Sequence, residues 1–260
     1  KGNKAGGFNS GLVNPADVVY DPEVNWTYEL GFKTDLLGGR ALFDATLFYS
    51  DLSGIQLFGF AETGTGSIIT NGGDADAYGF EVALSGEIAS GFNAAVGLAY
   101  ANPRFKDGSL LNSSASVGQC RNIPACANRV VTVNGRTALD LGGLSLPRQS
   151  DWQATAQFDI EQPLTDRFDW TFRGNYKYQS KQFTTTPPTN VGWVGDRHTI
   201  NLRAGLASEH WTVELFVDNL LDDGTPLNFG SGLNAANVTF PLTVVYGRRR
   251  AVGLETSLRF

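Results

Sequence analysis

The sequence has no methionine, only two cysteines and two histidines, and no long apolar run. A complete gene product begins with Met, so we expect the chain to be a processed product or a fragment. The lack of an apolar stretch of about 20 residues excludes a membrane-spanning helix. The net charge of -6 argues against a nucleic-acid partner, because binding to phosphates rewards clustered basic residues.

His198 and His210 are the two histidines, and they fall at opposite ends of one predicted hairpin. They cannot share a metal ion, so neither a metal site nor a resident cofactor is predicted; a haem ligand would need residues outside the chain. The segment Asp222-Asp223-Gly224 begins like a calcium loop, but the other ligand positions are missing and a turn is the better account. Ser, His and Asp occur without a nucleophile elbow, so the sequence does not predict an enzyme.

Cys120 and Cys126 enclose the short segment CRNIPAC within one loop-like region. Two thiols at this spacing lack the additional ligands that a zinc site needs. A local disulfide between Cys120 and Cys126 is therefore predicted for an oxidising compartment, with free thiols as the alternative.

Apolar and polar residues alternate with a period of two through much of the chain, a pattern that predicts β-strands. The clearest example runs from Trp152 to Ile160, where every second residue is apolar. Nine strands are predicted, at residues 24–34, 41–52, 76–86, 92–101, 150–160, 167–180, 197–206, 211–219 and 249–260.

The connections between these segments alternate between short and long, and the longest covers residues 101–147. Outer-membrane barrels have this pattern, with tight turns on one side and long loops on the other. Aromatic residues gather at the strand ends as two belts, which mark the two membrane interfaces. A β-sandwich would not concentrate its aromatics there. We therefore predict an all-β, transmembrane antiparallel β-barrel in the outer membrane of a Gram-negative bacterium, in contact with lipid and lipopolysaccharide.

The polar faces of the predicted strands carry charged residues, so the lumen is expected to be hydrated or plugged. These residues are Glu29, Glu81, Arg173, Lys177, Arg203, Glu214, Glu255 and Arg259. Nine strands cannot close a bacterial single-chain barrel, which has an even number of strands, and lipid does not tolerate an open sheet edge. The chain is therefore predicted to be part of a larger barrel.

Several stretches resemble the TonB-dependent receptors of the Gram-negative outer membrane. WTYELGFKTDLLGGRALFDATLFYSDLSGIQL and NGGDADAYGFEVALSGEIASGFNAAVGLAY look like two successive hairpins of that family. WTVELFVDNLLDDG is similar to its penultimate strand, with Asn219-Leu220 and Asp222 as the recognisable core, and GRRRAVGLETSLRF looks like its closing strand. The resemblance implies that the chain supplies the last nine strands of a 22-stranded barrel, without the plug domain and the TonB box.

The same resemblance implies energised import through the TonB-ExbB-ExbD complex, with a ferric siderophore or similar metal chelate as the expected cargo. A receptor for a carbohydrate or an aromatic compound is one alternative, and a passive porin-type channel is another. A membrane-embedded enzyme or adhesin would need a catalytic cluster or a passenger domain.

Cargo recognition is expected in the long loops, where function usually lies. The candidate substrate-binding residues are Arg121, Phe183, Trp193, Arg197 and Phe229, because Arg and aromatic side chains suit an anionic, partly aromatic cargo. Loop packing is the alternative for each of them. The alternating apolar residues that include Leu258 and end at Phe260 resemble the signal read by the outer-membrane assembly machinery; an ordinary aromatic of the inner belt is the alternative for Phe260.

Overall fold

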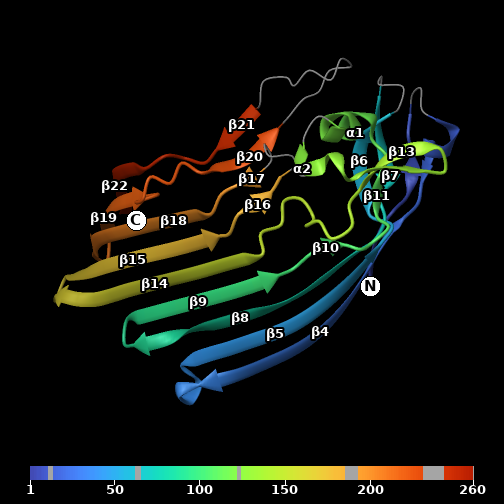
Figure 1. Ribbon diagram of the computed structural model, residues 1–260. Coiled ribbons are helices and arrows are strands. Elements are labelled where there is room, and N and C mark those ends of the chain that lie inside the picture. The colour runs from blue at the N-terminus through green and yellow to red at the C-terminus, as the bar shows by residue number, and fades with distance from the viewer. Residues whose placement is uncertain (11–13, 62–65, 122–123, 185–192, 231–242, 260) are drawn as a thin grey trace.

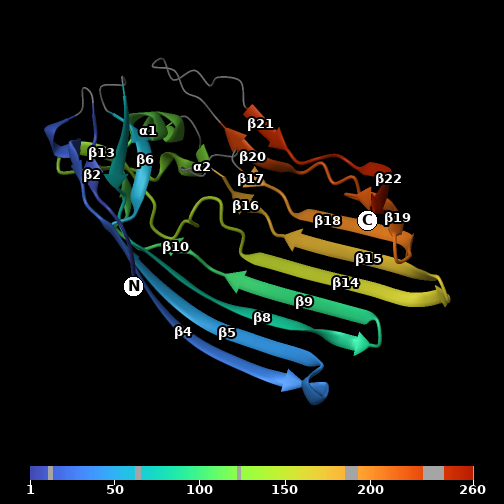
Figure 2. The same ribbon diagram turned by 180° about the vertical axis from the view of Figure 1, so that it is seen from behind.

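The computed structural model describes residues 1–10, 14–61, 66–121, 124–184, 193–230 and 243–259. Its main element is a curved, open antiparallel sheet (Figures 1 and 2). In spatial order the sheet contains β1 (Gly2–Lys4), β4 (Glu23–Leu36), β5 (Ala41–Ser53), β8 (Ala75–Ala89), β9 (Phe92–Ala101), β14 (Trp152–Thr165), β15 (Phe168–Gln179), β18 (Arg197–Ala207), β19 (Trp211–Asp218) and β22 (Ala251–Leu258), and β10 (Arg104–Phe105) pairs with β8. From β4 to β22, each strand of this path pairs with the next strand of the path along the chain, as in a meander.

The nine alternating segments of the sequence lie in the nine strands from β4 to β22, which we call the wall strands. Three strands extend further than their predicted bounds: β4 continues to Leu36, β8 to Ala89 and β14 to Thr165, whereas β22 begins two residues later than predicted and ends at Leu258. The turns after β8 and β14 shrink accordingly to Ser90–Gly91 and Asp166–Arg167. Pro163 lies at a register shift in the β14–β15 ladder, which lets the strand continue past a residue without an N–H.

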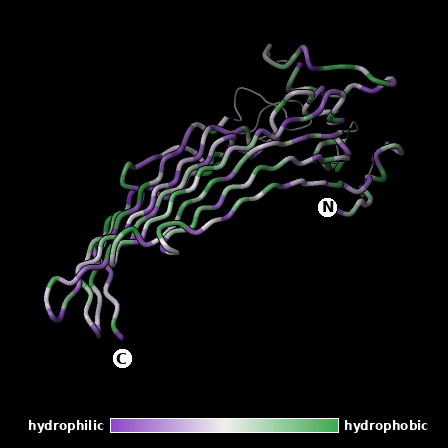
Figure 3. The backbone as a smooth tube through the Cα atoms, turned by 90° about the horizontal axis from the view of Figure 1, so that it is seen from below, coloured by the Kyte–Doolittle hydropathy of each residue, from purple (hydrophilic) through white to green (hydrophobic). Residues whose placement is uncertain are grey.

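The two faces of the sheet differ sharply in polarity. Hydrophobic and hydrophilic residues alternate along each strand (Figure 3). On the apolar face, Leu30, Leu47 and Leu215 are 72%, 59% and 63% exposed, and comparable side chains recur on every wall strand. A sheet in water would cover such a surface, whereas a sheet in a bilayer presents it to lipid. We therefore call this the lipid face and the opposite, polar face the lumen face.

Aromatic rings cover glycines that interrupt the wall strands. Phe48 and Phe216 lie on the lumen face among polar residues, and their rings cross to Gly79 and Gly253 on the neighbouring strands. A Cβ at Gly253 would lie 2.6 Å from the Phe216 ring. This packing explains why Phe216 breaks the alternation of its strand.

The long connections all lie at one end of the sheet, and they contain short elements of their own (Figure 1). These elements are β2 (Gly7–Phe8), η1 (Pro15–Asp17), β3 (Val19–Tyr20), β6 (Gln56–Phe60), β7 (Ser67–Asn71), β11 (Leu110–Leu111), α1 (Ser114–Arg121), α2 (Pro124–Ala127), β12 (Val130–Val133), β13 (Arg136–Asp140), β16 (Gln182–Phe183), β17 (Trp193–Val194), β20 (Pro226–Gly230) and β21 (Thr243–Tyr246), with η2 (Leu37–Gly39) in a short turn at the other end. We call the group from β2 to β13, without the wall strands and β10, the headpiece.

Among the described residues, the hydrophobic core lies mainly in the headpiece, with Phe105 of β10 at its border with the sheet. Leu111, Leu139 and Leu141 have no exposed surface, and they form one cluster with Ile55, Phe105 and the two cysteines. Among the described residues, no helix is both long and apolar enough to cross a membrane. Phe260, the expected assembly signal, lies outside the described residues, and Leu258 is the last residue of β22.

Candidate functional site

The headpiece is held together by a disulfide and by contacts between distant segments. Cys120 and Cys126 are bonded, which confirms the predicted bridge, and both are buried between α1, α2 and the central cluster. Asp17 is 6% exposed and accepts two hydrogen bonds from the guanidinium of Arg136, at 2.9 and 2.6 Å. A cross-link and a nearly buried ion pair give these loops a defined shape, as a binding surface requires.

Phe183 and Trp193 pair across β16 and β17, with ring centroids 5.1 Å apart in an edge-on contact. Phe183 is only 4% exposed, so it cannot offer its ring to a ligand in this arrangement, and loop packing accounts for it. Trp193 is 47% exposed, and the Lys181 ammonium lies 5.6 Å from its ring centroid. Trp193 therefore remains a candidate contact for cargo, with the edge-on contact to Phe183 holding its ring in place.

The other three predicted binding residues come from separate elements. Arg121 is exposed at the end of α1, beside the disulfide. Arg197 begins β18 and donates a hydrogen bond to the Gln179 side chain at 3.0 Å. Phe229 is partly buried in β20, which touches β17. Of the five candidate residues, Phe183 and Trp193 are in direct contact. Arg121 has no described contact with the other four.

The two histidines occupy separate places in the fold, His198 in β18 and His210 in the turn before β19. The described residues contain no cluster of three or more His, Cys, Asp or Glu that could hold a metal ion. His198 lies against Tyr176 and Tyr178, and its Nδ1 is 2.9 Å from the Tyr176 hydroxyl. The three residues form a polar-tipped aromatic group near the upper end of the lipid face, which suits the interface of a membrane.

The segment Asn219–Asp223 ties together the upper ends of three wall strands, and we call it the latch. The Asn219 side chain donates to the backbone oxygens of Asp223 and Arg248, both at 3.0 Å, and accepts from the Asp223 N–H at 2.9 Å. The Asp223 carboxylate accepts the His198 N–H at 2.6 Å, so the latch reaches β18 as well as β19 and the approach to β22. The predicted turn is therefore a connected hydrogen-bond network.

The latch should resist mild acid. The Arg249 guanidinium and the Arg250 N–H both bind the Asp222 carboxylate, and they hold its pKa well below its ordinary value. A carboxylate with a lowered pKa contributes stability above its ordinary pKa, and that contribution is lost only as the pH falls through the lowered value. Acidification from pH 7 to about 4, near the ordinary value, should therefore leave the Arg250 amide protected from hydrogen exchange after correction for the intrinsic rate. Loss of protection within this interval would contradict the assignment.

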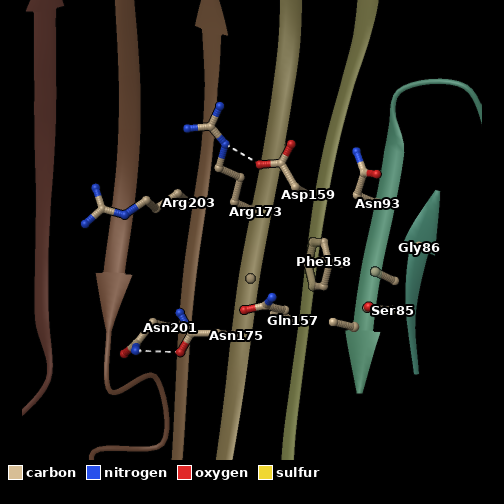
Figure 4. Close-up of a pocket in the computed structure, with 13 residues that line it drawn as sticks. Ser85, Gly86, Asn93, Gln157, Phe158, Asp159, Arg173, Asn175, Asn201 and Arg203 are labelled. Carbon is tan, nitrogen blue, oxygen red and sulfur yellow. Dashed lines mark hydrogen bonds and ion pairs between the residues drawn. The ribbon is translucent and has the colours of Figure 1, made fainter. Parts of the chain in front are cut away.

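The lumen face contains a polar hollow across β8, β9, β14, β15 and β18 (Figure 4). Its volume is about 570 Å³, and Gln157, Asn175 and Asn201 form one polar row along it, with Asn201 donating to Asn175 at 2.9 Å. The next row contains Asp159, Arg173 and Arg203. The chemistry that these side chains offer is hydrogen bonding and charge.

The charged row is neutralised mainly within the wall. The Arg173 Nε lies 2.5 Å from the Asp159 carboxylate, and its guanidinium also lies 3.5 Å from Glu214, which is 8% exposed. Arg203 is paired with Glu255 at 2.5 Å. The sequence placed these charges on the lumen face, and the register shows how carboxylates on adjacent strands balance them.

An antiparallel sheet with a lipid face, a polar lumen face and long structured loops at one end defines the wall of an outer-membrane β-barrel. The family model described as "TonB dependent receptor-like, beta-barrel" matches residues 2–220. The chain therefore belongs to the TonB-dependent receptor family, whose members are outer-membrane barrels of Gram-negative bacteria. A comparison with curated proteins finds no match.

Solved structures with the same fold include three receptors. The ferric yersiniabactin uptake receptor FyuA from Yersinia pestis has a TM-score of 0.71 at 18% identity, over 100% of this chain and 34% of its own. The siderophore receptor PiuA from Acinetobacter baumannii has 0.65 at 17%, over 94% and 29%. The ferripyoverdine receptor of Pseudomonas aeruginosa has 0.60 at 16%, over 96% and 29%. The chain thus spans about a third of the length of these structures, and identities this low establish the fold alone.

Proposed function

We propose that the chain is part of an outer-membrane receptor that imports a scarce nutrient, a ferric siderophore or a similar metal chelate, with energy supplied through TonB. The observation that carries the proposal is a folded, disulfide-linked headpiece at the end of a polar lumen wall, with Arg121 exposed on it and Trp193 exposed among the other long connections at the same end. A general diffusion pore has no need of a disulfide-linked, internally packed loop assembly. The names of FyuA, PiuA and the ferripyoverdine receptor support iron chelates as the class of cargo.

The proposal assigns different roles to the parts of the molecule. The lipid face contacts lipid and lipopolysaccharide, and the headpiece together with Trp193, Arg121 and Phe229 meets the cargo. Coupling to the TonB-ExbB-ExbD complex would be made by a plug and a TonB box, which lie outside this chain. Leu258 and Phe260 remain proposed signals for assembly. The 22-stranded closed barrel remains a prediction of the family resemblance.

The test is transport by the full-length receptor in an iron-starved Gram-negative strain that lacks its own iron receptors. We expect uptake of iron-55 supplied as a siderophore complex, and we expect deletion of TonB to abolish it. Uptake that persists without TonB would support a passive channel instead. Expression that responds to a sugar or an aromatic compound, and not to iron limitation, would remove the chelate from the proposal.

A further inference from the structure

The cations of the lumen face fall into two groups. In the described wall strands, five Lys or Arg residues occupy lumen-facing positions: Lys33, Arg173, Lys177, Arg197 and Arg203. Lys33 is paired with Asp44 at 3.2 Å, and Arg173 and Arg203 are paired with the carboxylates described above. No carboxylate of the described residues lies within ion-pair distance of Lys177 or Arg197. The charges of these two residues are therefore available to a group from outside the wall.

Lys177 and Arg197 are neighbours on adjacent strands. Lys177 pairs with Thr199, and Gln179 pairs with Arg197, so the two cations lie diagonally on the same face. Diagonal positions in an antiparallel pair are about 7–8 Å apart, a span that one small anion or two oxygens of one ligand can bridge with these long side chains. Both residues lie in the half of the wall that is nearer to the long loops, which a cargo released by the headpiece would reach next.

A hollow lies in front of Lys177. Its volume is about 260 Å³, and its lining includes the polar residues Ser85, Thr155, Gln157, Asn175 and Lys177. Ala95 and Gly97 on β9 leave the space open. Gln153 and Gln179 occupy the next row upward, beside Arg197. Lys177 thus borders an open space together with hydroxyl and amide groups, and Arg197, which donates a hydrogen bond to Gln179, lies one row nearer to the long loops. Two cations without a carboxylate partner beside such groups are a suitable environment for a multidentate oxyanion.

The charge pattern along the wall favours an anion at this level and not lower down. On β14 to β22, farther from the long loops than the Gln157–Asn175 row, the carboxylates Asp159, Glu161, Glu214 and Glu255 outnumber the two arginines. The carboxylates in the rows of Lys177 and Arg197 lie on β5 and β8 instead: Asp44, which is paired with Lys33, and Glu81. An anionic ligand would meet net negative charge there. Charges in a partly enclosed lumen are screened less than on an open surface, so the electrostatic potential at the two levels differs enough to affect where an anion binds.

We infer that Lys177 and Arg197 form an anion-binding subsite on the lumen wall, which receives the carboxylate or phenolate oxygens of an anionic metal chelate. This inference rests on the proposed function and narrows it, because it selects anionic chelates over neutral and cationic ones. The subsite lies below the loops, so it would hold the cargo after capture by the headpiece. The sequence alone pointed to Arg197 as a loop residue and to Lys177 as one of many solvated lumen charges.

The experiment measures uptake by the full-length receptor of iron-55 in three forms: a tris-catecholate complex, which is anionic, a neutral tris-hydroxamate, and the cationic complex of desferrioxamine B. We expect preferential uptake of the anionic complex. In the variant with Lys177→Gln and Arg197→Gln, the concentration for half-maximal uptake should rise about tenfold or more, because charge-assisted hydrogen bonds are lost. The single variant Lys177→Arg, which keeps the positive charge, should retain most of the affinity of the unmodified receptor for the anionic complex.

Lys33→Gln is the matched control, since it also removes one lumen cation, but one already paired within the wall. It should leave uptake of the anionic complex unchanged. Preference for the neutral or cationic complex, or anionic uptake unaffected by the double variant, would overturn the inference alone. A double variant that lowers the thermal stability of the receptor without changing uptake would show that the cations bind a carboxylate of the plug, which also overturns it. Failure to take up any of the three would count against the proposed function itself.

Discussion

Replacing Asn219 with Ala should lower the free energy of unfolding of the full-length receptor by about 2–4 kcal/mol, from lost hydrogen bonds and from backbone strain. Asn219 is 7% exposed and has a φ of 52°, a left-handed conformation that Asn tolerates better than Ala. Its side chain makes three hydrogen bonds that no water can fully replace in a buried position. The measurement is the guanidinium midpoint of receptor refolded in liposomes, together with the yield of heat-modifiable barrel in outer membranes.

Two further substitutions separate the causes. Asn219→Gly removes the same hydrogen bonds without the strain, so it should be milder than Asn219→Ala by about 1 kcal/mol. Asn134 has a similar φ of 50° but is exposed in the turn between β12 and β13. Asn134→Ala should cost only the strain and should not change the yield of barrel. Equal effects of the two Ala substitutions would mean that the hydrogen bonds of the latch contribute nothing to assembly.

The wall of the sheet could be predicted because its physical cause is local. Each strand buries neither face in a protein core, so lipid and water select the side chains directly, and the selection appears as alternation within a single segment. Residues from Trp152 to Ile160 show it without interruption. Phe216 departs from it because it covers a glycine on the next strand, a contact that depends on register and that no single segment reveals.

The headpiece could not be predicted in the same way, because long-range contacts stabilise it. The ion pair between Asp17 and Arg136 joins positions 119 residues apart. The strands of the headpiece are also too short to show a periodic pattern in the sequence. The disulfide could be predicted from the sequence because its two cysteines are six residues apart. The burial of Phe183 could not be predicted, because it depends on the position of Trp193 across the hairpin.

The candidate site could be predicted only in part, for a related reason. A sequence shows which residues can face the lumen, but not which charges are already neutralised there. Arg173 and Lys177 look equivalent in the alternation of β15, four residues apart on the same face. The register places Asp159 opposite Arg173 and Thr155 opposite Lys177, and this difference alone separates a paired cation from an available one.

Replacing Leu47 with Arg should lower the stability of the receptor in liposomes by about 2–4 kcal/mol, the cost of a cation on the lipid face near the middle of a bilayer. Leu47 is 59% exposed at the centre of β5, opposite Leu30 and Phe80 on the neighbouring strands. The measurement is again the guanidinium midpoint, with heat-modifiable mobility as a check that the barrel has formed.

Thr46→Arg is the matched control, because Thr46 is the preceding residue and faces the lumen. It lines a hollow of about 530 Å³ and pairs with Glu81, whose carboxylate can accept the new guanidinium. A paired surface charge changes stability by about 0–1 kcal/mol, so Thr46→Arg should have little effect. The difference between two adjacent positions depends only on which face meets lipid. If both substitutions were tolerated equally, the apolar face of the sheet would not be the membrane surface, and if Thr46→Arg were the more damaging, the two faces would be assigned the wrong way round.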